Sequence, residues 1–172
     1  SFMDDNNKWG FIDKTGVLVI PCYLNKAESF SDGMAFVQRH YRDVYIDHTG
    51  KIVKYPVKKY WKYHDGLTLV SGDNYIRGYV DSKGMVVIPI IWQDARDFQD
   101  GVAIVKGDNS LWGIIDKTGK VIAPCKWNYI APISEGLFAV QEDGKGWNGK
   151  WGYIDKVGNE VIPCKWKSAG TT

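Results

Sequence analysis

A nine-residue string that recurs along the chain constrains its fold more than any other feature. The string appears at 8–16 as KWGFIDKTG, at 111–119 as LWGIIDKTG and at 150–158 as KWGYIDKVG. Two looser copies end at Gly50 and Gly84. Five copies in register indicate one structural unit that repeats along the chain.

An aspartate marks the register of every copy, and a glycine follows it three residues later. The pairs are Asp13 with Gly16, Asp47 with Gly50, Asp81 with Gly84, Asp116 with Gly119, and Asp155 with Gly158, at steps of 34, 34, 35 and 39 residues. Aspartate accepts hydrogen bonds from the backbone N–H groups that follow it, and glycine tolerates the left-handed conformation. The pattern therefore predicts hairpin turns, in preference to a ladder of carboxylates that binds metal or sugar.

Short runs rich in β-branched and aromatic residues, bounded by Gly and Pro, predict strands. No stretch shows helical spacing of apolar residues over three turns. The strands are expected near 9–13, 17–20, 34–37, 44–47, 51–54, 67–70, 77–80, 85–88, 102–105, 111–115, 120–123, 137–140, 151–154 and 159–162.

Each repeat is thus expected to be a three-stranded antiparallel meander of about 35 residues, in which a proline closes the second strand. A single meander is too small to bury its own apolar face, so neighbouring repeats must stack. The fold class is therefore all-β, a tandem array of about five meanders. An open superhelical array is favoured, with a closed five-bladed propeller-like ring as the alternative.

The repeats divide most of the chain. Residues 1–7 form an N-terminal lead, in which Ser1–Met3 can be a cloning remnant, and residues 167–172 form a C-terminal tail. The repeat domain spans 8–166, and the array is expected to be a piece of a longer one. Its repeats lie near 8–33, 34–66, 67–101, 102–136 and 137–166.

The strings at 8–16 and 150–156 resemble the WG (KWG) repeat family, and the segment VIPCKW at 161–166 belongs to the same pattern. The resemblance implies repeats found mostly in bacterial proteins, with a scaffold or binding role and no catalytic residues to transfer. Repeat two departs from the pattern, with Asp43-Val44 where Trp-Gly belongs and Tyr55 where Pro belongs. Repeat three has Arg77 in place of Trp.

Composition excludes several classes of protein. The 22 basic and 20 acidic residues give a formal charge of +2, so the chain as a whole is not a strongly basic nucleic-acid binder. The chain contains no run of 18 apolar residues, so no membrane span is predicted, and no signal peptide is visible. Localisation and oligomeric state are left open by the sequence.

No catalytic residue, cofactor or metal is expected. Cys22, Cys125 and Cys164 each follow the proline of a repeat, where Ile90 fills the same position in repeat three. Zinc sites need converging ligand pairs such as Cys-x-x-Cys, so these cysteines are interpreted as small buried thiols. The three histidines, His40, His48 and His64, lie in no recognisable catalytic motif. The chain is therefore predicted not to be an enzyme, and an enzyme is kept only as the remote alternative.

Two sets of tryptophans share a register. Trp9, Trp112 and Trp151 are expected to pack in the core across a glycine of a neighbouring strand, with stacking on carbohydrate as the alternative. Trp92, Trp127 and Trp166 lie three residues after the proline and are expected to bridge adjacent repeats.

Departures from the repeat pattern are the candidate binding surfaces. The stretch 51–63 holds five Lys and four aromatic residues with no acid, and the loop 144–149 lengthens one hairpin. The predicted function is a scaffold that binds protein or peptide, and an anionic polymer or polysaccharide is the alternative partner. An alternative interpretation is that the lysines of repeat two bind no partner and only protect a strand edge. The candidate binding residues are Lys54, Lys58, Lys59, Trp61, Lys62 and Trp147.

Overall fold

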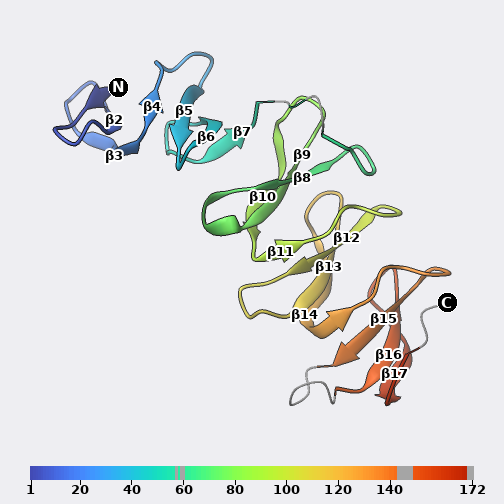
Figure 1. Cartoon of the computed structure of the whole chain (residues 1–172). Coiled ribbons are helices and arrows are strands. Elements are labelled where there is room, and N and C mark those ends of the chain that lie inside the picture. Colours follow the sequence, from blue (N-terminus) through green and yellow to red (C-terminus); the bar gives the residue numbers. More distant parts are fainter. Residues whose placement is uncertain (57, 59–60, 143–148, 170–172) are drawn as a thin grey trace. The chain divides into compact units, whose positions relative to one another are not determined.

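The computed structural model describes residues 1–56, 58, 61–142 and 149–169, and these residues form an all-β protein (Figure 1). The single helical element in the described part is a 3-10 turn at Asp73–Tyr75. Every run predicted to form a strand contains one. The all-β prediction is therefore confirmed.

The chain divides into two compact units, residues 1–61 with 80–86, and residues 62–79 with 87–172. The first unit holds two sheets, of strand order β1-β2-β3 and β4-β5-β6-β7. Their strands are β1 Phe2–Met3, β2 Trp9–Ile12, β3 Leu18–Leu24, β4 Lys26–Ala27, β5 Ala35–Arg39, β6 Arg42–Ile46 and β7 Ile52–Lys54.

The second unit holds most of the sheet β8-β9-β10 and the whole seven-stranded sheet β11 to β17. None of the four sheets that the described strands form closes into a barrel, which is consistent with an open repeat arrangement. The strands are β8 Thr68–Ser71, β9 Arg77–Val80, β10 Val86–Trp92, β11 Asp94–Ala95, β12 Val102–Lys106, β13 Trp112–Asp116, β14 Val121–Ile130, β15 Leu137–Glu142, β16 Trp151–Asp155 and β17 Glu160–Trp166.

The prediction that a proline ends the second strand of each repeat is wrong. β3 contains Pro21 and continues to Leu24, and β10, β14 and β17 pass through their prolines in the same way. Phe11 pairs with Ile20 whereas Trp9 pairs with Leu24, so β3 is bulged between these two pairs. A bulge needs no donor from the proline, and the strand continues beyond it.

In the seven-stranded sheet, β14 pairs with strands on both sides and so joins one meander to the next. β14 pairs with β13 through Val121, Ala123 and Trp127, and with β15 through Trp127, Tyr129 and Ile130. The last two meanders therefore belong to one continuous sheet, whereas β3 and β4, and likewise β10 and β11, belong to different sheets. Figure 1 shows this continuity from β12 to β17.

The core of the second unit is built at the junctions between repeats. One buried cluster contains Trp92 together with side chains of β9, β10, β12 and β13. A second contains Trp127 together with side chains of β12 to β16. Trp92 and Trp127 are thus buried among residues of adjacent repeats, as predicted, whereas Trp166, the third tryptophan of that prediction, is 52% exposed.

The Asp-x-x-Gly turns have the predicted chemistry. In each turn the aspartate Oδ1 accepts hydrogen bonds from the N–H groups two and four residues later, at 2.8–3.1 Å. The five turn glycines have φ between +80° and +85°. Hydrogen bonds, the first of them from the Thr15 hydroxyl, lower the pKa of Asp13, and the Thr118 hydroxyl acts in the same way on the pKa of Asp116. These carboxylates therefore stabilise the hairpins.

Residues 1–7, the predicted lead, contain a strand. In β1, Phe2 pairs with Gly10 and Met3 with Trp9. In the later repeats, Val105 pairs with Gly113 and Val140 with Gly152. β1 thus occupies the place of the strand that precedes the Trp-Gly strand in those repeats.

Candidate interaction site

The glycine of each Trp-Gly pair lies against the bulge of the next strand. A Cβ atom built on Gly113 would lie 2.6 Å from the carbonyl oxygen of Ala123 and 2.9 Å from Cys125 Sγ. Gly10 and Gly152 have the same surroundings in the first and last repeats. The close approach of this glycine to the bulge therefore explains both the glycine of the Trp-Gly pair and the Pro-Cys pair of the next strand.

The tryptophans of the Trp-Gly pairs are half-buried, so the prediction that they lie in the core holds only in part. Trp112 packs against the second core cluster. The guanidinium of Arg96 and the Nζ of Lys106 lie over its ring, 5.1 and 5.6 Å from the centroid. Two cationic side chains therefore pack against the half-buried Trp112 ring.

A row of aromatic and cationic side chains continues from Trp112. Arg96 also lies 5.4 Å from the centroid of the Tyr129 ring, and Tyr129 meets Trp151 edge to face at 5.8 Å between centroids. The Arg96 Nη1 donates a hydrogen bond to the carbonyl oxygen of Ile130 at 3.0 Å. These contacts hold the Arg96 side chain in place between two repeats.

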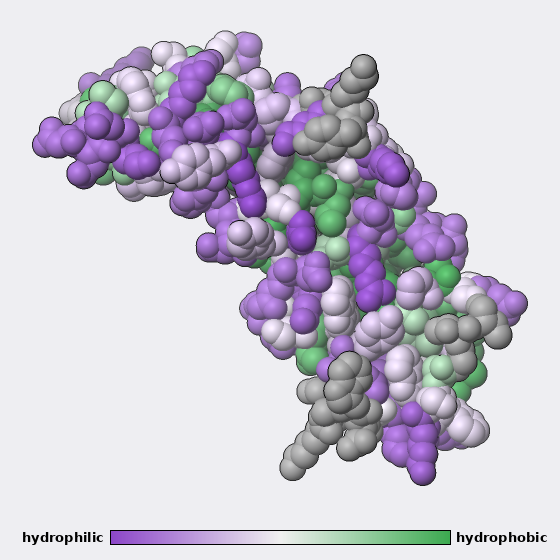
Figure 2. All heavy atoms as spheres, viewed as in Figure 1, coloured by the Kyte–Doolittle hydropathy of each residue, from purple (hydrophilic) through white to green (hydrophobic). Residues whose placement is uncertain are grey.

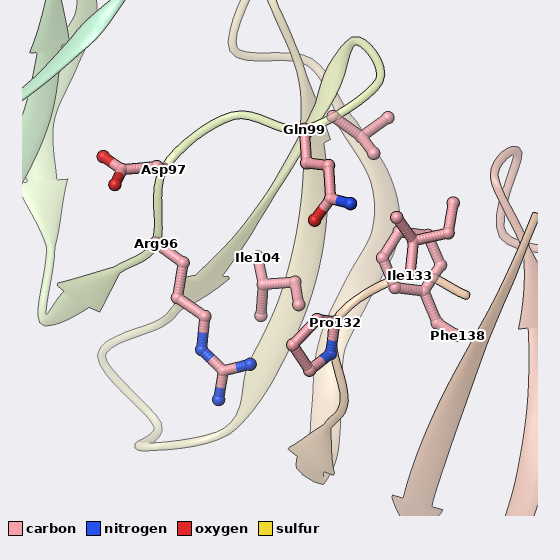
Figure 3. Close-up of a pocket in the computed structure, with 8 residues that line it drawn as sticks. Arg96, Asp97, Gln99, Ile104, Pro132, Ile133 and Phe138 are labelled. Atoms are coloured by element: carbon pink, nitrogen blue, oxygen red, sulfur yellow. The ribbon is translucent and has the colours of Figure 1, made fainter. Parts of the chain in front are cut away.

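Beside Arg96 lies an apolar pocket of about 200 Å³ (Figure 3). It is formed by the loop between β11 and β12 and the loop between β14 and β15. Buried side chains of Val102, Ile104 and Phe138 line it, together with Pro132 and Ile133. Its residues come from successive repeats, so the stacking of repeats creates it.

Polar groups border this pocket on one side. Figure 3 shows the Arg96 and Gln99 side chains directed toward Ile104 and Pro132, whereas the Asp97 carboxylate points away. Asp97 instead lies 3.5 Å from His64 Nε2. On the face seen in Figure 2, hydrophobic surface is broken into small patches among hydrophilic side chains. The pocket therefore combines an apolar interior with a cation and an amide at its edge.

The structure describes only part of the basic stretch that the sequence predicts as a binding surface. The Lys54 Nζ lies 5.2 Å from the centroid of the Tyr45 ring, and the half-buried Trp61 donates its backbone N–H to the carbonyl oxygen of Lys58. Lys58 and Lys62 are exposed, but Lys62 belongs to the second compact unit. Two further candidate residues, Lys59 and Trp147, lie outside the described residues.

The residues that the structure describes contain no group of three or more His, Cys, Asp or Glu side chains placed to hold a metal ion. Cys22, Cys125 and Cys164 are half-buried free thiols, and burial raises the pKa of each one. His48 stacks on Phe30 with 4.1 Å between ring centroids. Within the described part, no helix has the length and apolar character needed to cross a lipid bilayer.

A family model described as WG containing repeat matches residues 9–40, 78–109, 112–145 and 151–171. Each matched range begins at a Trp-Gly pair or at its counterpart in repeat three, and together they cover more than half of the chain. The matched ranges leave out 41–77, where repeat two lacks the Trp-Gly pair and the proline. No curated protein matches the chain. The chain belongs to the family of WG-containing repeat proteins.

Proposed function

We propose that this repeat protein is a non-catalytic scaffold that binds a protein or peptide partner, with the pocket beside Arg96 as an anchor site. The observation that carries the proposal is the apolar pocket that stacked repeats form between the β11–β12 and β14–β15 loops. Binding interfaces commonly concentrate their energy where one partner inserts an apolar side chain into such a pocket.

The size of the pocket favours a peptide side chain over a metabolite. Its volume of about 200 Å³ is below the roughly 300–1,000 Å³ that small-molecule sites occupy. It has room for one or two apolar side chains of a partner. The Arg96 guanidinium and the Gln99 amide at its edge are placed to bind backbone carbonyls or a carboxylate of the same segment.

The alternative partner is an anionic polymer or polysaccharide on the basic stretch 51–63. Part of that stretch is engaged internally, because Lys54 lies over the Tyr45 ring and Tyr55 is buried. Trp112 is half-buried and has two cationic side chains packed against its ring, which disfavours stacking on sugar. These contacts support the protein or peptide partner over the polymer.

Selection from a random peptide display library, with the immobilised protein as bait, tests the proposal. We expect selected peptides to share an apolar anchor residue. Pro132→Glu places a charge at the exposed wall of the pocket and is expected to weaken their binding about tenfold or more in titration calorimetry. The matched control is Val121→Glu, which introduces the same charge at an exposed strand position that does not line the pocket.

Circular dichroism would establish that both variants keep the fold of the wild type. Ile133→Ala gives a second measure, because it enlarges the pocket without adding charge. Peptides that bind all three variants and the wild type equally would contradict the assignment of this pocket, and so would a library that yields no binder.

A further inference from the structure

Two cations beside the pocket are not neutralised by the protein itself. Arg96 lines the pocket, and Lys106 is the cross-strand partner of Trp112, over whose ring both side chains lie. Neither cation forms an ion pair with a carboxylate among the residues that the structure describes. Two half-buried positive groups therefore approach one aromatic ring at the edge of an apolar pocket.

The acidic side chains of the same segment are engaged elsewhere. β11 and the loop that follows it contain three carboxylates, and each one lies near a basic group: Asp94 near Arg77 Nε at 3.9 Å, Asp97 near His64 Nε2 at 3.5 Å and Asp100 near Lys156 Nζ at 3.3 Å. Figure 3 shows the Asp97 carboxylate directed away from the Arg96 guanidinium. The positive charge of Arg96 and Lys106 is therefore available to a partner.

Arg96 is also held in position at both ends. The hydroxyl of the fully buried Tyr79 donates a hydrogen bond to the Arg96 carbonyl oxygen at 2.6 Å, and the Arg96 Nη1 donates to the Ile130 carbonyl oxygen. A guanidinium carries five N–H donors in a fixed plane, so several donors remain for a ligand. Because the side chain is already ordered, binding costs it less conformational entropy.

We infer that the partner of this pocket is an acidic peptide segment, in which an Asp or Glu lies beside the apolar anchor residue. The inference rests on the proposed function, because it names the chemistry of the segment that the pocket binds. The apolar side chain enters the pocket, and the neighbouring carboxylate accepts hydrogen bonds from the remaining Arg96 donors and faces Lys106. Hydrogen bonds between a guanidinium and a carboxylate are among the strongest in proteins.

The carboxylate adds to the apolar contact and does not replace it. Sites that hold a polyanion by charge gather many cations, whereas this one has two. Charge pairs at the rim of an interface act mainly on specificity and on the rate of association, and salt weakens them. The expected partner is therefore distinguished by both features together, an apolar anchor and an acid next to it.

Fluorescence anisotropy with labelled synthetic peptide pools tests the inference. Every peptide has a central Phe or Leu, and the flanking positions are Asp or Glu in the acidic pool and Asn or Gln in the amide pool. The two pools have nearly the same shape and differ in charge. The wild type is expected to bind the acidic pool about tenfold more tightly at about 50 mM salt, and this preference is expected to disappear near 500 mM salt.

Lys106→Gln removes one charge and keeps most of the side chain over Trp112, so it should reduce the preference for the acidic pool to about threefold. Arg96→Gln should abolish the preference. The matched control is Lys165→Gln, because the Lys165 Nζ lies 5.4 Å from the centroid of the Trp166 ring and does not line the pocket. This control should keep the full preference.

Arg96→Gln also removes the hydrogen bond to the Ile130 carbonyl oxygen. If circular dichroism shows that this variant is unfolded, Lys106→Gln and the salt dependence of the wild type carry the test. Lys165→Gln reducing the preference as much as Lys106→Gln does would overturn the inference, because the effect would then come from net charge alone.

A third pool, with acidic residues around a central serine, separates the inference from the proposed function. The wild type is expected to bind it at least about tenfold more weakly than the acidic pool. Equal binding of the acidic and amide pools would overturn the inference and leave the apolar anchor site standing. Equal binding of the serine pool and the acidic pool would overturn the anchor site itself, and binding of no pool would overturn both.

Discussion

Gly158 lies so close to the carbonyl oxygen of Ile122, in the preceding repeat, that a Cβ atom at this position would be 2.6 Å from that oxygen. The turn glycine therefore meets two separate requirements. It adopts φ +84°, which disfavours any side chain, and it rests on the backbone of its neighbour. The hairpin turn and the stacking of repeats thus depend on the same residue.

The first prediction separates these two requirements. Gly16→Ala and Gly158→Ala both place alanine at nearly the same φ, +85° and +84°. The Gly16 variant should lose only about 1 kcal/mol of unfolding free energy, the effect of φ alone. The Gly158 variant should lose about 1–3 kcal/mol more, because its Cβ meets a backbone atom of the preceding repeat. Urea denaturation of both variants measures the difference, and equal losses would show that the glycine does not bear on stacking.

The second prediction concerns the Trp-Gly pair. Gly113→Ala should lower the unfolding free energy by about 2–4 kcal/mol, because its Cβ would lie 2.6 Å from the Ala123 carbonyl oxygen and 2.9 Å from the Cys125 backbone nitrogen. Cys125→Ala removes the neighbouring sulfur and leaves the backbone in place, so it should lose less than about 1.5 kcal/mol. Thermal and urea unfolding compare the two. If Gly113→Ala proved as mild as Cys125→Ala, the bulge would not require glycine.

The third prediction concerns the cysteines, for which burial raises the pKa of the thiol. We expect iodoacetamide to react slowly with the folded protein at neutral pH and with three thiols in denaturant. The thiol pKa is higher in the folded than in the unfolded protein, so the folded state favours the neutral thiols. The stability that this preference contributes is present below about pH 8.5 and is lost as pH rises through the folded pKa. Zinc retained through a chelator wash, or fewer than three thiols in denaturant, would contradict the interpretation.

Sequence periodicity was sufficient to predict the strands and the turns, because both depend on local chemistry. The Asp-x-x-Gly turns use hydrogen bonds within five residues, and glycine at positive φ has few substitutes. The bulge at Pro21 was missed because proline was interpreted only through its missing N–H, although a bulge accommodates it.

The pocket beside Arg96 was missed for a different reason. Its walls come from Arg96 and Gln99 in one loop and from Pro132 and Ile133 in another, one repeat later. None of these residues departs from an ordinary loop composition, and only the stacking of repeats brings them together. The half-burial of Trp112 likewise depends on Arg96 of the preceding repeat, so the sequence of one repeat could not show it.

The fourth prediction addresses the basic stretch. Because Lys54 lies over the Tyr45 ring, we expect the wild type not to bind heparin or oligonucleotides at about 50 mM salt, where polyanion contacts are strongest. The double variant Lys58→Glu with Lys62→Glu should behave as the wild type does. Binding by the wild type that the double variant abolishes, and that higher salt weakens, would instead establish the anionic partner.

The last prediction concerns Tyr55, which stands where other repeats have proline. The Tyr55 backbone N–H donates to the carbonyl oxygen of Gly84 at 2.8 Å, and Lys54 forms a β-bridge with Met85. Proline would lose this hydrogen bond, so repeat two departs from the repeat pattern for a structural reason. Restoring the family residue with Tyr55→Pro should therefore destabilise the protein.

The expected loss for Tyr55→Pro is about 1–3 kcal/mol, since a buried carbonyl would lose its donor and the buried ring would be removed as well. Tyr55→Phe is the matched control, because it keeps both the N–H and the ring, and it should lose less. Hydrogen exchange at the Tyr55 amide of the wild type, followed by NMR, reports on the bond itself. Fast exchange at that amide, or a Tyr55→Pro variant as stable as the wild type, would show that repeat two had simply relaxed its sequence and that its lysines serve as edge protection.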